Sequence, residues 1–193
     1  MVVSDSSTNK MSDEQIVELI VAGNTELFAE IISRYQKQLI VYTRRLTFST
    51  EAAEDVTQNA FIKTYQNLRS FNTEKKFSSW IYRIAHNEAV NYIRKHRREI
   101  TTSEETWFDT KASSRESIEK IVDRKLSNEA LANALRQLPQ KYREPTLLHA
   151  IEGKSYEEVG DILRLPTATV GTRIRRAKAK LRVILEEKGE WNG

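Results

Sequence analysis

KKFSSWIYRIAHNEAVNYIRKHRR, residues 75–98, begins with aromatic side chains and ends in a basic run. One face of a helix through this segment would carry Ile81, Ile84, Ala85, Ala89 and Tyr92. A second face would carry Trp80, Arg83, Asn87, Asn91, Arg94 and Arg98. The pattern predicts an amphipathic helix with one face in a core and one polar face. The polar face is able to bind nucleic-acid bases, although Trp80 could instead pack in the core.

The composition sets the limits of the fold and excludes most chemistry. With 193 residues and 39% hydrophobic residues, the chain is one medium domain or two small ones. It has no cysteine and three scattered histidines, so we expect no metal, no cofactor and no catalytic residue. A Walker-type glycine-lysine loop is also missing from the sequence. A net charge of +4 is too small by itself to indicate a nucleic-acid binder.

The sequence also bears on where the protein acts. It contains no apolar run near the roughly 20 residues that span a bilayer. The first ten residues lack the apolar core of a signal peptide. We therefore expect a cytoplasmic protein without membrane insertion.

Helical periodicity runs through the N-terminal half. Ser12 and Gln15 form a potential capping box for a short helix that ends near Gly23. The next helix carries an apolar stripe of Phe28, Ile31, Ile32, Tyr35, Leu39, Tyr42 and Leu46. A third helix, capped by Thr50, has an inner face of Ala53, Val56, Ala60, Phe61, Tyr65 and Leu68. A short polar loop, RSFNTEKK, joins it to the opening segment.

Helical periodicity fades between residues 99 and 119, where serine, threonine and acidic residues dominate. This stretch is predicted to be a flexible linker. The fold class is therefore all-α, with two small helical domains joined by that linker. The predicted divisions are a disordered N-terminus at 1–11, a first domain at 12–98, the linker at 99–119, a second domain at 120–188 and a tail at 189–193.

The second domain ends in a helix-turn-helix pattern. After a break at Pro139 come SYEEVGDIL and TATVGTRIRRAKAKLRVILEE, separated by three residues. Ser155 and Glu158 form a capping box for the first helix. In the second, Val170, Ile174, Ala177, Leu181 and Ile184 face inward, which leaves Thr169, Thr172, Arg173, Arg176 and Lys180 outside. Such a helix fits the DNA major groove, although a solvated amphipathic helix has the same pattern.

Three ordered blocks together resemble the bacterial extracytoplasmic-function (ECF, group 4) sigma factors of the sigma-70 family. They are AEDVTQNAFIKTYQNLRSF, FSSWIYRIAHNEAVNYIRK and LPQKYREPTLLHAIEGKSYEEVGDILRLPTATVGTRIRRAKAKLR. The resemblance implies that the first domain is sigma region 2, which recognises and melts the minus-ten promoter element. It implies that the second domain is region 4, which binds the minus-thirty-five element. Its implied partners are core RNA polymerase, duplex and melted promoter DNA, and an anti-sigma factor.

The resemblance also implies site residues. Binding to core polymerase is assigned to Asp55, Gln58, Asn59 and Lys63. Minus-ten binding is assigned to Asn72, Lys75, Lys76, Trp80, Arg83, Asn87, Asn91 and Arg94. Minus-thirty-five binding is assigned to Thr169, Gly171, Thr172, Arg173, Arg175, Arg176 and Lys178. In the linker, Trp107 and Phe108 either anchor the segment or pack locally.

The sequence departs from the common family pattern at several positions. The resembled family often has an aspartate at Asn91, a glutamate at Asn59, a small residue or glycine at Arg164 and a basic residue at Gly171. Gly171 either allows the backbone to approach a DNA phosphate closely or makes this position a poor reader of the DNA. Arg175 and Lys178 would then carry more of the DNA contact. Pro145 falls in a stretch that the family makes helical, so we expect a kink or a late helix start there.

Two other functions fit parts of the sequence. A dimeric helix-turn-helix repressor would explain the C-terminal third, but it would bind duplex DNA without polymerase. An enzyme has little support, because His86, His96 and His149 form no recognisable triad or metal pattern.

Overall fold

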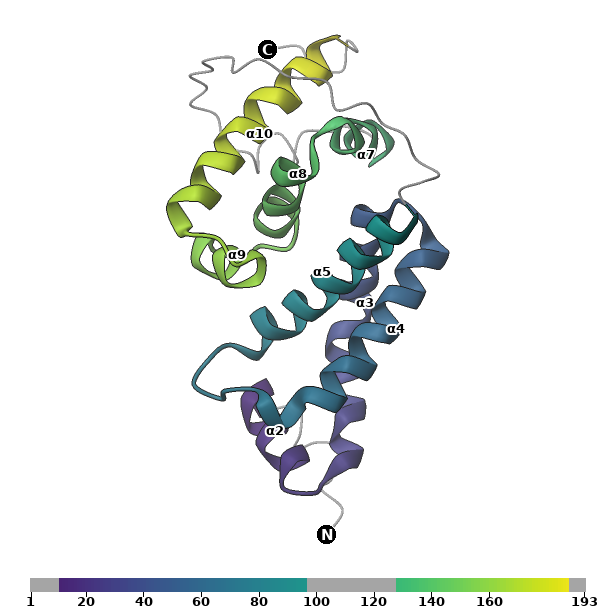
Figure 1. Cartoon of the computed structure of the whole chain (residues 1–193), viewed down its shortest axis with the longest axis vertical. Coiled ribbons are helices and arrows are strands. Elements are labelled where there is room, and N and C mark those ends of the chain that lie inside the picture. The colour runs from purple at the N-terminus through teal and green to yellow at the C-terminus, as the bar shows by residue number, and fades with distance from the viewer. Residues whose placement is uncertain (1–10, 97–127, 188–193) are drawn as a thin grey trace. The chain divides into compact units, whose positions relative to one another are not determined.

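The computed structural model describes residues 11–96 and 128–187, which are helical with no strand (Figure 1). The chain divides into two compact units, Met1–Arg97 and Arg98–Gly193, and each is described by itself. Several predictions fall outside the described residues. They are the disordered N-terminus up to residue 10, Arg98, the linker with Trp107 and Phe108, the start of the second domain up to residue 127, and the tail.

The N-terminal unit is a small helical bundle. Its elements are α2 (Asp13–Val21), a 3₁₀ turn (Thr25–Leu27), α3 (Phe28–Thr47), α4 (Thr50–Asn67), a second 3₁₀ turn (Leu68–Ser70) and α5 (Phe77–His96). The helices α3, α4 and α5 pack against one another, and α2 packs across one end of them (Figure 1). The predicted stripes supply this core, with Ile31, Leu39, Tyr42, Ala53, Ala60, Ile81 and Ala85 all buried.

Several polar groups inside this bundle are paired, while the buried hydroxyls of Thr64 and Ser79 have no hydrogen-bond partner among the residues that the structure describes. The Tyr42 hydroxyl lies 3.0 Å from His86 Nδ1. Thr43 and Thr57 join α3 to α4 through hydroxyl groups 3.1 Å apart. His86 is 7% exposed, so it lies inside the core.

Two details of α4 correct the sequence analysis. The N-cap of α4 is Ser49, whose hydroxyl accepts a hydrogen bond from the Ala52 amide at 3.2 Å, and Thr50 is the first helical residue. Ser49 has the extended backbone that a capping residue needs. Tyr65 was predicted on the inner face but is 45% exposed. The predicted capping box of Ser12 and Gln15 is confirmed at α2.

The C-terminal unit contains α7 (Asn128–Gln137), α8 (Gln140–Thr146), a π-helical turn (Leu147–Ile151), α9 (Tyr156–Leu163) and α10 (Thr167–Glu187). The long helix α10 packs against α7, α8 and α9. Its predicted inner residues, Val170, Ile174, Ala177, Leu181 and Ile184, are all buried. The predicted capping box of Ser155 and Glu158 is confirmed at the start of α9.

Pro145 does not delay the start of its helix. It lies inside α8, which begins at Gln140, and the helix widens into the π-helical turn directly after Thr146. Proline cannot donate the backbone hydrogen bond of a regular helix. Within the π-helical turn the bonding has shifted, since the Glu152 amide bonds the Leu147 carbonyl five residues back at 3.1 Å.

The turn between α9 and α10 is tight. The Leu165 amide donates to the Gly160 carbonyl at 2.9 Å, and a Cβ at Gly160 would lie 2.8 Å from the Leu165 carbonyl oxygen. Arg164 adopts the left-handed conformation with φ of 55°, which glycine adopts without strain. Glycine would therefore fit this position without strain, and Arg164 occupies it at a cost.

We expect Arg164→Gly to raise the free energy of unfolding by about 0.5–1 kcal/mol, because it relieves the left-handed strain. Urea unfolding followed by circular dichroism measures this change. Arg164→Ala removes the same side chain and keeps the strain, so it should give no such gain. Equal stabilisation by both variants would contradict the strain argument.

The two glycines of the helix-turn-helix should respond to alanine with opposite signs. Gly160→Ala should destabilise by about 1–3 kcal/mol, because its new Cβ meets backbone. Gly171 faces only the ring edge of Tyr156 at 3.4 Å, so Gly171→Ala should stabilise by up to about 1 kcal/mol through helix propensity. The same unfolding measurement compares the two, and a Gly160→Ala protein as stable as the parent would be inconsistent with the close approach described.

Candidate nucleic-acid and polymerase interface

The loop between α4 and α5 is fixed at both ends and exposed between them. Phe71 and Phe77 are buried, with ring centroids 5.4 Å apart. All residues from Asn72 to Lys76 are exposed. The Asn72 side-chain oxygen accepts a hydrogen bond from the Glu74 backbone amide at 2.9 Å. The Asn72 backbone carbonyl accepts one from the Lys75 backbone amide at 3.0 Å. Asn72 therefore shapes the loop, while Lys75 and Lys76 lie on its surface.

The sequence left two alternatives for Trp80, a place on the polar face or a place in the core, and the structure shows a position between them. Its ring packs against Phe71 at 5.2 Å and Phe77 at 5.7 Å between centroids. The residue is nevertheless half-buried rather than buried. Trp80 is thus anchored by the core and still has part of its ring exposed beside the loop.

The polar side of α5 continues from Trp80 as a strip along the helix. Asn87, Asn91 and Arg94 are exposed and Arg83 is half-buried. The Arg94 guanidinium donates to the Asn91 side-chain oxygen at 3.2 Å. The structure therefore brings the predicted minus-ten residues together on one loop and one helix face, which we call the loop-and-strip surface: Asn72, Lys75, Lys76, Trp80, Arg83, Asn87, Asn91 and Arg94.

The predicted polymerase-binding residues lie on the outer side of α4. Asp55, Gln58, Asn59 and Lys63 are all exposed. The Lys63 ammonium is 2.6 Å from the Glu88 carboxylate of α5, with side-chain exposures of 50% and 14%. The pair joins an exposed ammonium to a mostly buried carboxylate, and it fixes where the Lys63 side chain lies.

A groove beside this face was not found from sequence. It lies between α3 and α4, has a volume of about 710 Å³ and includes Gln58 in its wall. Its apolar lining is Phe28, Ile32, Ile40, Phe61, Ile62 and Tyr65. Ile62 and Tyr65 are 47% and 45% exposed, respectively. Ile62 is an apolar residue next to the predicted polymerase-binding Lys63, and this was the signal in the sequence that could have indicated the groove.

The predicted minus-thirty-five residues of α10 differ in exposure. Arg175 and Arg176 are exposed, whereas Thr169, Gly171, Thr172 and Arg173 are half-buried. The Thr172 hydroxyl donates to the Ala168 carbonyl at 2.9 Å. Lys178 is only 8% exposed and lies on the buried side of the helix. Lys178 is therefore not among the residues that we propose to contact DNA. Lys180 was predicted to lie outside, but it is half-buried beside the Tyr142 ring.

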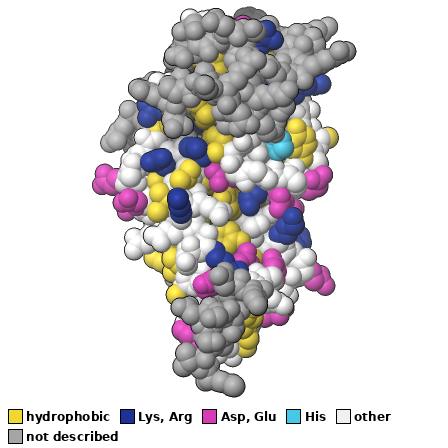
Figure 2. Space-filling model, turned by 180° about the vertical axis from the view of Figure 1, so that it is seen from behind, with side chains coloured by type: hydrophobic (Ala, Val, Ile, Leu, Met, Phe, Trp, Pro, Cys, Tyr) yellow, Lys and Arg dark blue, Asp and Glu magenta, His cyan; other side chains and the backbone are white. Residues whose placement is uncertain are grey.

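Charge is mixed over the visible surface. Figure 2 shows lysine and arginine side chains interspersed with aspartate and glutamate, with hydrophobic side chains between them. Among the residues that the structure describes, no cluster of three or more histidine or acidic side chains could hold a metal ion. Across 11–96 and 128–187, no helix is both long and apolar enough to cross a membrane.

Comparison with known proteins follows the same two units. The family model for sigma-70 region 2 matches residues 31–99, and the model for sigma-70 region 4 matches residues 128–181. The ECF RNA polymerase sigma factor SigW of Bacillus subtilis strain 168 is 31% identical over 191 residues, which cover 92% of this chain and 99% of SigW. The ECF RNA polymerase sigma-E factor of Escherichia coli K12 is 30% identical over 178 residues, covering 89% and 93% of the two chains.

Solved structures show the same fold. CnrH in complex with the cytosolic domain of CnrY is similar with a TM-score of 0.69 and 24% identity, covering 91% of this chain and 97% of that one. The sigma factor RpoE in complex with the anti-sigma factor NepR from Bartonella quintana has a TM-score of 0.65 and 22% identity, with coverage of 82% and 96%. With both regions matched in order and relatives aligned along nearly their whole length, the chain belongs to the ECF sigma factors of the sigma-70 family and is a promoter-directing transcription initiation factor.

Proposed function

We propose that the loop-and-strip surface captures and separates the minus-ten element. The observation that carries this proposal is the anchored loop: its exposed residues stand between buried Phe71 and Phe77, beside the partly exposed ring of Trp80. Unpairing and unstacking a base costs a few kcal/mol, and stacking on an aromatic ring recovers about 1–3 kcal/mol per base. Melting would then be driven by binding, with no nucleotide hydrolysis by this chain.

The recognition helix α10 is the part proposed to bind the minus-thirty-five duplex. Arg173, Arg175 and Arg176 supply cationic groups on its outer side, and arginine bonds guanine edges in a forked geometry. Thr169, Gly171 and Thr172 lie near the start of the same helix, where HTH proteins place residues against base edges. The Thr172 hydroxyl already donates its proton to the Ala168 carbonyl of the same helix, so toward DNA this side chain can act only as a hydrogen-bond acceptor.

The outer face of α4 is the proposed contact with core RNA polymerase. It offers Asp55, Gln58, Asn59 and Lys63. The exposed Ile62 and Tyr65 of the adjacent groove extend this face with apolar surface. Large exposed apolar side chains are common at protein interfaces, so these two residues strengthen the case for a protein partner on this side of α4.

The proposed division of labour follows the two units. Residues 12–98 act as region 2 and residues 120–188 as region 4, with 99–119 as the connection. The chain would contribute binding and DNA melting, with RNA synthesis left to the polymerase, so it needs no catalytic residue or cofactor. It would act in the cytoplasm, where the polymerase and the chromosome are.

An anti-sigma factor is the proposed negative regulator. The structure of RpoE was solved with the anti-sigma factor NepR, and that of CnrH with the cytosolic domain of CnrY. A partner that covers the α4 face would compete with polymerase for the same residues. Co-purification of the tagged chain from its own cells, with and without added core polymerase, tests for such competition.

Transcription in vitro tests the function directly. The purified chain is added to sigma-free bacterial core RNA polymerase on a pool of promoter fragments, and the transcripts are sequenced. We expect initiation from a subset of fragments that share two spaced elements. Absence of initiation, together with tight dimeric binding to duplex DNA without polymerase, would instead establish a repressor.

Substitutions in α10 should separate phosphate contacts from base contacts. In the holoenzyme, loss of a phosphate-binding arginine should reduce the slope of log affinity against log salt by about one, whereas loss of a base contact should relax minus-thirty-five preference. Arg175→Ala and Arg176→Ala are the test variants. Arg182→Ala is the matched control, because Arg182 pairs with Glu186 at 2.7 Å near the other end of α10. If neither test variant differs from the control in slope or preference, α10 does not bind the promoter as proposed.

A further inference from the structure

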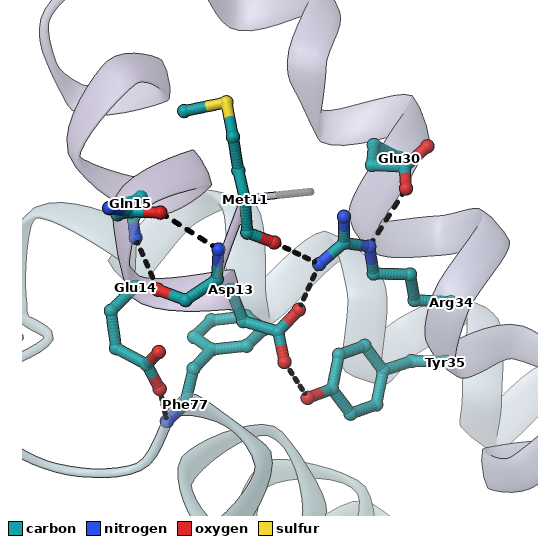
Figure 3. Close-up of polar contacts among 9 residues, drawn as sticks. Met11, Asp13, Glu14, Gln15, Glu30, Arg34, Tyr35 and Phe77 are labelled. Atoms are coloured by element: carbon teal, nitrogen blue, oxygen red, sulfur yellow. Dashed lines mark hydrogen bonds and ion pairs between the residues drawn. The ribbon is translucent and has the colours of Figure 1, made fainter. Parts of the chain in front are cut away.

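The start of α5 is held by a side chain from a distant part of the sequence. The Phe77 amide donates a hydrogen bond to Glu14 Oε1 of α2 at 2.9 Å, across 63 positions of sequence (Figure 3). The first amides of a helix have no acceptor within the helix, and a carboxylate there gains both a charged hydrogen bond and favourable interaction with the helix dipole. Glu14 therefore caps the helix that carries the minus-ten strip.

The position of Glu14 is set by its neighbour, which ties α2 to α3. Asp13 bonds the Arg34 guanidinium at 2.8 Å and also accepts a hydrogen bond from the Tyr35 hydroxyl. Arg34 reaches the Met11 carbonyl at 3.0 Å and Glu30 at 2.8 Å (Figure 3). Burial, then the Asp13 carboxylate, raises the pKa of Tyr35 well above its usual range, so this hydroxyl remains a donor. These contacts fix the first turn of α2, and Glu14 with it.

The capped residue is also the anchor of the minus-ten loop. Phe77 directly follows Lys76, and its buried ring packs on Tyr35 at 5.7 Å and on Trp80 at 5.7 Å between centroids. A shift of Phe77 would therefore move the end of the loop and the partly exposed ring of Trp80 together. The contacts that run from α3 through α2 therefore end at Phe77, the residue on which the positions of the loop end and of the Trp80 ring depend.

We propose that Glu14 is a positioning residue for promoter opening: by capping Phe77 it holds the loop Asn72–Lys76 and Trp80 in the geometry that receives the separated strand. This inference rests on the minus-ten role proposed above for the loop-and-strip surface. Glu14 lies outside that surface and need not touch DNA. Its effect should appear in the opening step rather than in polymerase binding.

Three variants of α2 test the role in the assembled holoenzyme. Glu14→Ala removes the acceptor, Glu14→Gln keeps a side-chain oxygen that can accept the same bond, and Glu18→Ala removes an exposed glutamate from the same helix. Opening is followed at saturating holoenzyme by a fluorescent base analogue in the minus-ten element, on a duplex promoter and on one with that element already unpaired. Affinity for core polymerase is titrated separately.

We expect Glu14→Ala to slow opening of the duplex promoter by roughly fivefold to tenfold, less than the full contribution of a hydrogen bond to a charged group, because water replaces part of the lost bond. Glu14→Gln should stay within about twofold of the parent chain because a neutral hydrogen bond is retained. Glu18→Ala and the core affinities should not change. Opening by Glu14→Ala at the parent rate would overturn the inference. So would parallel loss of opening and core affinity, which indicates general unfolding.

Amide exchange provides a second measurement that does not depend on transcription. Exchange at Phe77, Ser78 and Ser79 in the full chain should be faster in Glu14→Ala and unchanged in Glu18→Ala. Unchanged exchange in Glu14→Ala would show that the cap does not order this turn, and the inference would fail while the minus-ten role could stand. If the parent chain opens no promoter, the minus-ten role itself fails, and the positioning role fails with it.

Discussion

The burial of Phe77 is the constraint on which the N-terminal unit depends. Its ring is fully buried, although the residues from Asn72 to Lys76 before it are all exposed. Burying a phenylalanine ring contributes about 1.5–3 kcal/mol, and contacts with Tyr35, Phe71 and Trp80 add directional aromatic interactions. The polar loop is consequently a short span between two fixed points. A loop with both ends fixed has less backbone entropy to lose on binding than a free loop.

The C-terminal unit fixes its DNA-binding element by a different means. The angle between α9 and α10 is set by backbone approach, because Gly160 lets the Leu165 carbonyl come within a distance that excludes a side chain. The chain tolerates the left-handed Arg164 in the same turn. One unit is thus anchored by aromatic burial and the other by close backbone packing. The polar surface of the first lies on an anchored loop and a helix, and that of the second lies on a helix.

The sequence predicted what depends on local periodicity. Ile81, Ala85 and Ala89 recur at helical spacing and are buried, and Ser12 and Ser155 carry capping boxes whose partners lie three residues away. Features that depend on tertiary packing were not predictable in this way. Serine and threonine both cap helices, so the backbone angles alone select Ser49 over Thr50. The bond from Phe77 to Glu14 leaves no periodic signal.

Lys178 and Pro145 show two further limits. A lysine in a basic run indicates a DNA contact, but its apolar stem also packs well against a core, and here it is 8% exposed. A proline in a helical pattern indicates a kink or a boundary, yet the chain widens into a π-helical turn and continues. In both cases the residue type permits two outcomes, and the surrounding packing decides between them.

The departure at Asn91 has an electrostatic consequence that the geometry makes concrete. Asn91 accepts a hydrogen bond from Arg94 at 3.2 Å with a neutral oxygen, where an aspartate would accept it with a charged one. The pairing that orients Arg94 is kept, but the guanidinium charge is not neutralised. The strip therefore carries one more uncompensated positive charge than it would with aspartate, in a position exposed to solvent. Phosphate attraction increases with each such charge and decreases with salt, so in the proposed minus-ten role Asn91 would give the strip a stronger and more salt-dependent attraction for the DNA backbone than aspartate would.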